Sequence, residues 1–211
     1  MAILNVPATY ATPALANAAA SSGDTILIQA GTYTETASID FIAGITITGA
    51  GATPNDVILD NSTTTTVNMS AAGARTFSNL TIRNSMASGG STKNALKANN
   101  VGVITATNVY FTTLNVTCVD KCEIGSSFTG CMFAIAFNAT GSSKDGFRGI
   151  SSNPSTLKAC LFLGFTGMGV NALGSTLINC TAYEAMTAVA PTYGLYAGNL
   201  HNCAIWTPNV T

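Results

Sequence analysis

Short β-type runs that repeat along the chain constrain its fold more than any other feature of the sequence. From residue 77 onwards, six seven-residue runs align, and the fourth and sixth residues of nearly every run are apolar. This alternation is typical of a strand that buries one of its two faces. The fourth residues recur every 20–29 positions, at Leu80, Val109, Cys131, Cys160, Cys180 and Cys203. An irregular period of this length indicates stacked coils that are joined by loops of variable length.

Stacking is required because one such unit cannot bury its apolar face alone, whereas neighbouring units share a continuous core. The segment 44–49 is similar to an earlier coil, and a second, weaker strand precedes most runs, for example at 95–97 and 147–150. We therefore predict an all-β solenoid of about seven coils. Coils would follow one another at the ~4.8 Å spacing of paired strands.

Charge and hydropathy exclude several classes of protein. Charged residues make up 8% of the chain and the net charge is −1, so the basic face of a nucleic-acid-binding protein is missing. The longest apolar stretches are far shorter than the ~20 residues that span a membrane. No basic, signal-like segment follows Met1, so we expect folding in a cytoplasm without a secretion signal.

The N-terminal segment differs from the repeats. Pro13 and the alanines after it indicate a short helix with Thr12 as its N-cap, and 25–28 is typical of a strand. We predict an N-terminal cap over residues 1–36, with a helix and a first strand, and β-helix coils over 37–211. Together they would form one domain.

The segments Ala14–Ala18 and Gly23–Glu35, with the strand sequence GDTILIQAGTYTE, resemble the opening of the right-handed parallel β-helices of the pectin-lyase-like superfamily. Residues 45–51 and 77–84 also resemble the second and third coils of that superfamily, as found in pectin methylesterases. The resemblance implies a right-handed, single-stranded parallel β-helix whose first coil is capped by a short helix. It indicates the fold and says little about function.

Enzymes of the superfamily carry acids on the outer face of consecutive coils, and methylesterases use two Asp, an Arg and Gln residues. The nine acidic residues of this chain do not recur at one strand position in adjacent coils. General acid and base chemistry by paired carboxylates requires two acids within several ångströms. We therefore predict no catalytic residues, no metal, no cofactor, and no hydrolase or lyase activity on pectin-like polymers.

Two charged segments allow an alternative. The segments 118–123 and 144–148 contain Asp120, Glu123 and Asp145, which could form a saccharide or metal site and make the protein a polysaccharide-binding or polysaccharide-cleaving β-helix. The simpler interpretation is two solvated turns with ion pairs worth under ~1 kcal/mol each. His201, the single histidine, is expected to be a hydrogen-bonded residue at a bend.

Two ladders follow from the alignment. Cysteines hold one inward position in four successive coils and are expected to be buried thiols: Cys131, Cys160, Cys180 and Cys203. Asparagines hold the third position of four runs and are expected at sharp bends: Asn79, Asn108, Asn179 and Asn202. Cys118 and Cys122 could form a disulfide, bind a metal or do neither, and we favour the last.

The outward positions of the repeated runs predict an exposed surface, here named the apolar stripe: Tyr110, Met132, Leu161, Leu163, Tyr183 and Trp206. Large exposed patches of this kind mark interfaces. We therefore expect a homo-oligomer, with a trimer as its expected form, or docking on a larger particle such as a capsid or tail. Low charge, abundant Thr and the missing leader resemble bacteriophage virion proteins. The first hypothesis is thus a non-enzymatic structural protein of a virion, without nucleic-acid or membrane partners, and a secreted adhesin fragment is a further alternative.

Overall fold

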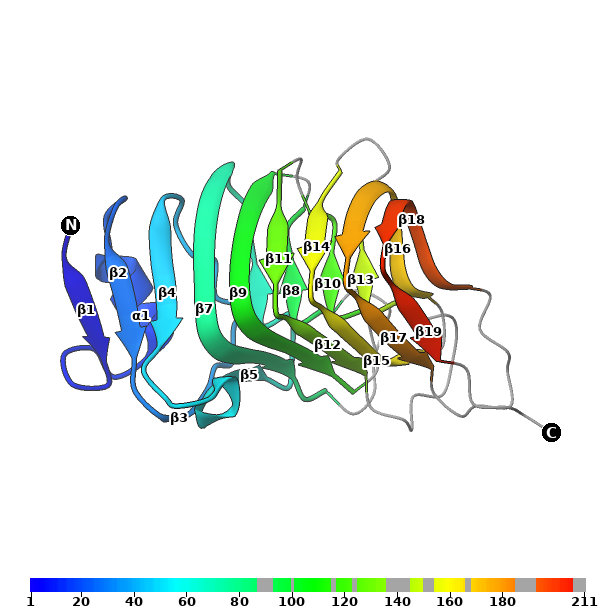
Figure 1. The fold of residues 1–211 in the computed structure, drawn as a ribbon. Helices are drawn as coiled ribbons and strands as arrows, with labels where there is room; N and C mark the ends of the chain where they lie inside the picture. The colour runs from blue at the N-terminus through cyan, green and yellow to red at the C-terminus, as the bar shows by residue number, and fades with distance from the viewer. Residues whose placement is uncertain are drawn as a thin grey trace.

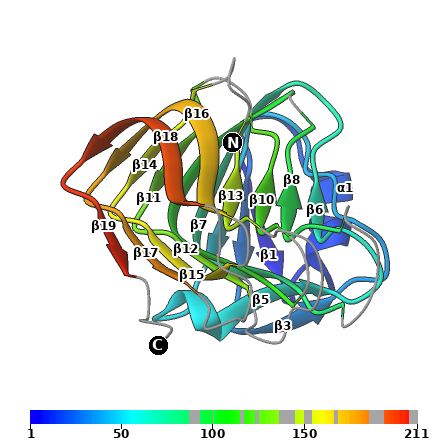
Figure 2. The ribbon, with the colours of Figure 1, turned by 90° about the vertical axis from the view of Figure 1, so that its right-hand side faces the viewer.

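A single parallel sheet wound around one axis forms the molecule. The computed structural model describes residues 1–86, 93–99, 101–114, 117–122, 125–135, 145–149, 154–165, 168–184 and 193–206. Within these ranges, 19 strands pair in parallel and follow one another from the N-terminal to the C-terminal end (Figure 1). Viewed along the axis, the sheet bends into three faces (Figure 2), here named A, B and C. The predicted right-handed parallel β-helix is confirmed.

Each face is built from strands that recur once per coil. Face A contains β1 (Ile3–Val6), β2 (Thr25–Ile28), β4 (Ile45–Gly49), the first half of β7 (Gly73–Asn84), the first half of β9 (Gly102–Thr113), β11 (Ser127–Thr129), β14 (Thr156–Lys158) and the last residues of β16 (Met168–Ile178) and β18 (Tyr193–His201). Face B contains β3 (Gly31–Thr34), β5 (Val57–Asn61), the second halves of β7 and β9, β12 (Met132–Ile135), β15 (Leu161–Phe165), β17 (Thr181–Glu184) and β19 (Ala204–Trp206). Face C contains β6 (Val67–Asn68), β8 (Leu96–Lys97), β10 (Val119–Asp120), β13 (Phe147–Arg148) and the first residues of β16 and β18.

The core lies inside the three faces and consists of side chains stacked from coil to coil. Phe111, Phe133 and Phe162 stand in register on β9, β12 and β15. Their rings stack with centroid separations of 5.2 Å and 4.9 Å. Because alternate residues point inward, every second side chain of these strands is buried. The same alternation fixes which residues are presented on the outer surface.

A short helix lies at the side of the first coils, near the N-terminal end (Figures 1 and 2). The helix α1 (Pro13–Ala19) begins after Thr12, whose side chain accepts a hydrogen bond from the Leu15 N–H. Asn17 connects the helix to the next coil, since its Nδ2 donates to the Asp40 carbonyl and its Oδ1 accepts from the Ile42 N–H. A single 3₁₀ turn, Pro54–Asp56, precedes β5. Within the described ranges, no helix has the length and apolar character needed to cross a membrane.

The bend between faces A and B has a left-handed backbone. Asn79, Asn108, Asn179 and Asn202 have φ values of 51–53°, and Gly130 and Ala159 take the equivalent places with φ of 61° and 52°. Asn108 donates from Nδ2 to Asn79 Oδ1 at 3.0 Å, and Asn202 donates to Asn179 Oδ1 at 2.8 Å. The asparagine stack is therefore two separate pairs, because Gly130 and Ala159 lie between them.

Candidate functional site

Face C presents a continuous column of polar side chains. The two-residue strands of this face place one residue inward and the next outward. The inward residues Val119 and Phe147 are fully buried. The outward residues pair in register along the axis: Asn68, Lys97, Asp120, Arg148, Asn171 and Tyr196. We name this set the face C column.

An ion pair forms the centre of the face C column. Arg148 Nε donates to Asp120 Oδ1 at 2.7 Å, across adjacent coils. The Asp120 side chain is 4% exposed and that of Arg148 is 40% exposed. The hydrogen bond that Arg148 donates to Asp120 raises the pKa of Arg148, against the lowering effect of burial. The guanidinium therefore keeps its charge, and it is the more exposed member of the pair.

A second carboxylate lies beside this pair. Asp145 precedes β13 and is buried. Its Oδ1 accepts from the Met168 N–H at 2.8 Å and its Oδ2 accepts from Asn171 Nδ2 at 3.1 Å. Its charge also helps to raise the pKa of Arg148. Asp145 therefore holds Asn171 in the column and places a second negative charge near the guanidinium.

The charges of the column alternate along the axis. Lys97 precedes Asp120 by one coil and Arg148 follows it by one coil, so two cations flank one carboxylate. Among the described residues, no group of three His, Cys, Asp or Glu side chains could hold a metal ion. The face C column is thus a line of polar and charged side chains on consecutive coils, with Asp120 between two cations.

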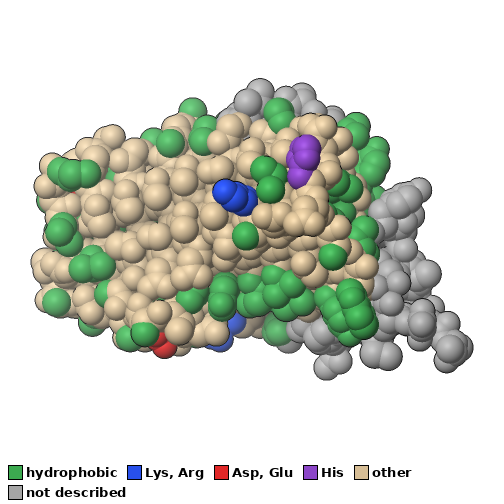
Figure 3. Space-filling model, in the orientation of Figure 1, with side chains coloured by type: hydrophobic (Ala, Val, Ile, Leu, Met, Phe, Trp, Pro, Cys, Tyr) green, Lys and Arg blue, Asp and Glu red, His purple; other side chains and the backbone are tan. Residues whose placement is uncertain are grey.

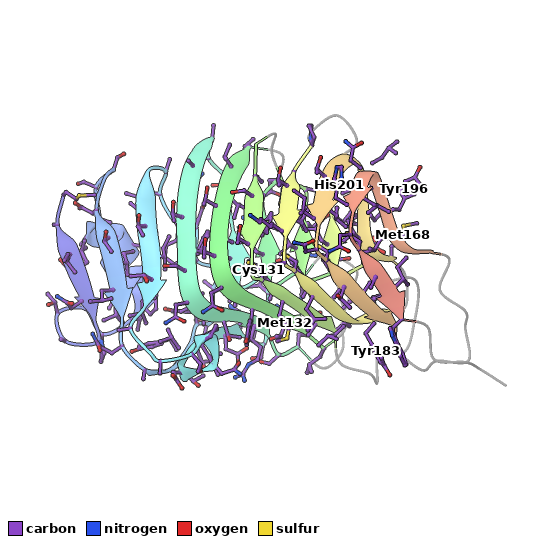
Figure 4. The ribbon with its side chains drawn as sticks, viewed as in Figure 1. Cys131, Met132, Met168, Tyr183, Tyr196 and His201 are labelled. Atoms are coloured by element: carbon purple, nitrogen blue, oxygen red, sulfur yellow. The ribbon has the colours of Figure 1, made fainter. Side chains whose placement is uncertain are left out.

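The predicted site residues are distributed over different parts of the molecule. Asp120 and Asp145 come together around Arg148, whereas Glu123 lies outside the described residues. His201 is the last residue of β18, on face A, and its side chain is exposed (Figure 4).

The thiols lie in the core. Cys131, Cys160 and Cys180 are buried, and Cys203 in the last coil is half-buried. Cys118 and Cys122 are buried as well, and all six cysteines are free thiols. Burial raises the pKa of Cys118 to about 12.

The apolar stripe occupies the outer side of face B. Tyr110, Met132 and Leu161 form one register column, and Leu163, Tyr183 and Trp206 form the next. Trp206 is 62% exposed and its ring stacks on Tyr183 at 6.0 Å. In Figure 3, hydrophobic side chains gather along the lower edge of the rod toward its C-terminal end. Its part in assembly stays a prediction.

Sequence reasoning placed Asp120 in one charged segment and Asp145 and Arg148 in another, but it missed the pairing of Asp120 with Arg148 and missed Lys97 and Asn171 as neighbours. The signal was present in the weak strands that precede the repeated runs. Aligning their inward residues, Leu96, Val119, Phe147 and Val170, would have placed the charged residues in one column.

Comparison with known proteins gives a fold and no closer relationship. No family model matches the chain, and no curated protein matches it. Pectin methylesterase PemA from Erwinia chrysanthemi matches with a TM-score of 0.64 and 16% identity, over 100% of this chain and 72% of that one. The chain folds as this enzyme does. Pectin methylesterase from carrot matches with a TM-score of 0.63 and 13% identity, over 96% of this chain and 82% of that one.

A rhamnogalacturonan lyase also matches, with a TM-score of 0.51 and 18% identity, over 86% of this chain and 55% of that one. These matches correct two expectations. The predictions of a non-enzymatic virion protein and of no enzymatic activity are wrong, because the structures that share the fold along the chain are polysaccharide-processing enzymes. The sequence-based prediction looked for acids at matched positions of the long repeated strands. The face C column lies on the short strands instead.

Proposed function

We propose that the protein binds and processes an acidic polysaccharide along face C. The observation that carries the proposal is the Asp120–Arg148 pair at the centre of a polar column on consecutive coils. The similarity to pectin methylesterases supports it. A polysaccharide is an extended ligand, and the column runs along the axis of an extended rod.

The charges favour a substrate that carries carboxylates. An arginine presents a planar group that suits carboxylates, and its hydrogen bonds to them are stronger than those between neutral groups. Lys97 and Arg148 lie two coils apart, a separation of roughly 10 Å at the spacing of paired strands. Two cations at this interval along one line suit a chain with regularly repeated carboxylates. Asn171 adds an amide to the same line.

For the chemical step we assign Asp120 as the base or nucleophile, and Arg148 as the group that stabilises negative charge on the substrate. Because Asp120 is 4% exposed and is bound by Arg148, the guanidinium has to release the carboxylate and turn toward the substrate before the carboxylate can act. Asp145 is not assigned this step, since its two oxygens already hold Met168 and Asn171.

Binding of polygalacturonate oligosaccharides, measured by calorimetry, tests the proposal. Arg148→Gln should weaken binding by about tenfold or more, because charge-assisted hydrogen bonds contribute ~1.5–3 kcal/mol. Lys158→Gln is the matched control, since it removes one positive charge from face A and should leave binding unchanged. Equal affinities of the two variants, or no binding by the unaltered protein, would refute the proposed site.

Turnover is measured separately, as methanol released from methylated pectin and as unsaturated products from polygalacturonate. Asp120→Asn should abolish whichever product the unaltered protein forms. Binding without any product would leave face C as a binding site and would overturn the enzymatic part of the proposal.

A further inference from the structure

Face A carries an array of hydroxyl side chains that the proposed function does not use. In seven consecutive coils, one outward position of this face is Thr or Ser: Thr25, Thr46, Thr76, Thr105, Ser127, Thr156 and Thr176. Two residues further along the strands, a second column contains Thr48, Ser78, Thr107 and Thr129. We name the two columns together the hydroxyl array.

The side chains of the hydroxyl array point outward, and the strands that carry them are anchored by buried side chains. The residues between its two columns point inward, and Ile47, Phe77 and Phe128 among them are fully buried. The side chains of Thr105 and Thr107 are exposed. Threonine is stiff at χ1 because it is β-branched, so each coil presents its hydroxyl and methyl groups in a nearly fixed place.

The array has two regular spacings. Neighbouring coils are ~4.8 Å apart, and alternate residues along a strand are ~6.7 Å apart. The parallel register is unbroken from β2 to β14 on this face. The strands of face A lie side by side along the rod (Figure 1). The result is a two-dimensional lattice of hydroxyl and methyl groups.

Charged and aromatic side chains are missing from the hydroxyl array. The outward positions that flank it carry Lys158 and His201 only toward the C-terminal end. Figure 3 shows this face mainly in the colour of uncharged side chains and backbone. The aromatic residues Tyr110, Tyr183 and Trp206 lie on face B instead.

We propose that the hydroxyl array binds ice. Both of its spacings are close to distances that repeat between oxygen atoms at the surface of hexagonal ice. Hydroxyl groups can donate and accept hydrogen bonds to water molecules held at those places. The methyl groups are uncharged and form no hydrogen bonds, so they do not compete with the hydroxyl groups for the ordered water. One hydroxyl pair, Ser78 Oγ to Thr48 Oγ1 at 2.8 Å, fixes the orientation of two members of the array.

A purely structural role for the threonines would have a different consequence. Cross-strand Thr pairs stabilise sheets, so a substitution would then change stability without changing the behaviour of ice. The proposed polysaccharide site is on face C and is independent of this array, so failure of one proposal leaves the other intact.

The experiment measures inhibition of ice recrystallisation and the gap between melting and freezing temperatures of a single ice crystal in the purified protein. The unaltered protein should shape the crystal and open a gap. Thr105→Lys should abolish both effects. Thr112→Lys is the matched control, since it adds the same charge to the same strand, β9, but on face B, and it should keep both. Circular dichroism confirms that each variant is folded, and Thr129→Lys replaces Thr105→Lys if the latter does not fold.

No effect on ice beyond that of an equal concentration of albumin would overturn the proposal. Equal loss of both effects on ice in folded Thr105→Lys and Thr112→Lys would overturn the proposal too, because the effects would then not come from face A. Sedimentation with microcrystalline cellulose is measured in parallel. Binding to cellulose that is lost in Thr105→Lys, without any effect on ice, would assign the array to a polysaccharide surface instead.

Discussion

Burial decides the chemistry of individual cysteines in this protein. Cys160 stands in the core between Cys131 and Cys180, and its hydrogen bond with Cys131 and its burial raise its pKa to about 12. The thiolate is the reactive form of cysteine, so such a thiol is inert at neutral pH. Cys203 holds the same position in the last described coil, where no strand of the described residues stacks beyond it, and it is only half-buried.

We predict that one thiol of the folded protein reacts rapidly with Ellman's reagent at pH 8, and that Cys203→Ser removes this fast phase. Unfolding in guanidinium should make all six cysteines reactive. Cys160→Ser serves as the control, because it should leave the fast phase in place. Fast reaction of three or more thiols in the folded protein would contradict the buried stack.

At the scale of elements, the sequence predicts long strands well and short strands poorly. The runs at 77–83 and 106–112 lie within the 12-residue strands β7 and β9, long enough for alternation to be visible. The strands β6, β8, β10 and β13 have two residues each, too few to show a period. The candidate site lies on these short strands, so its acids could be identified while their register, and with it the pairing of Asp120 with Arg148, could not.

The bend between faces A and B allows a test of the preference for asparagine at the left-handed position of the repeat. Ala159 adopts a φ of 52°, a left-handed conformation that costs an alanine ~1–2 kcal/mol. Asparagine tolerates this conformation better. An amide oxygen introduced at this place could also accept a hydrogen bond from Asn179, in the same way as Asn179 Oδ1 accepts one from Asn202.

We predict that Ala159→Asn raises the free energy of unfolding by about 1 kcal/mol, measured by urea denaturation, because the strained alanine is relieved. Ala74→Asn, at an exposed strand position of face A, is the control and should bring no gain. A loss of stability in both variants would show that the bend does not favour asparagine.

At the scale of the whole molecule, the three faces present three kinds of surface on one core: hydroxyl groups on face A, the apolar stripe on face B and the charged column on face C. The two ends differ as well. The helix α1 packs at the N-terminal end, and Val6 in the first strand is fully buried. In the last coil, Leu200 and Ile205 are 48% and 46% exposed, although they stand in register with Leu177 and Ala182, which are fully buried.

This contrast predicts that the same substitution has different effects in adjacent coils. Leu177→Ala leaves a cavity between two stacked coils and should lower the free energy of unfolding by ~2–5 kcal/mol. Leu200→Ala removes a half-exposed side chain at the end of the stack and should cost under about 1 kcal/mol, as substitutions near the surface usually do. Urea denaturation at several protein concentrations measures both. If Leu200→Ala costs as much as Leu177→Ala, and its cost grows with protein concentration, a second copy covers the last coil in solution. The predicted self-association would then involve the end of the rod as well as the apolar stripe, because Trp206 belongs to both.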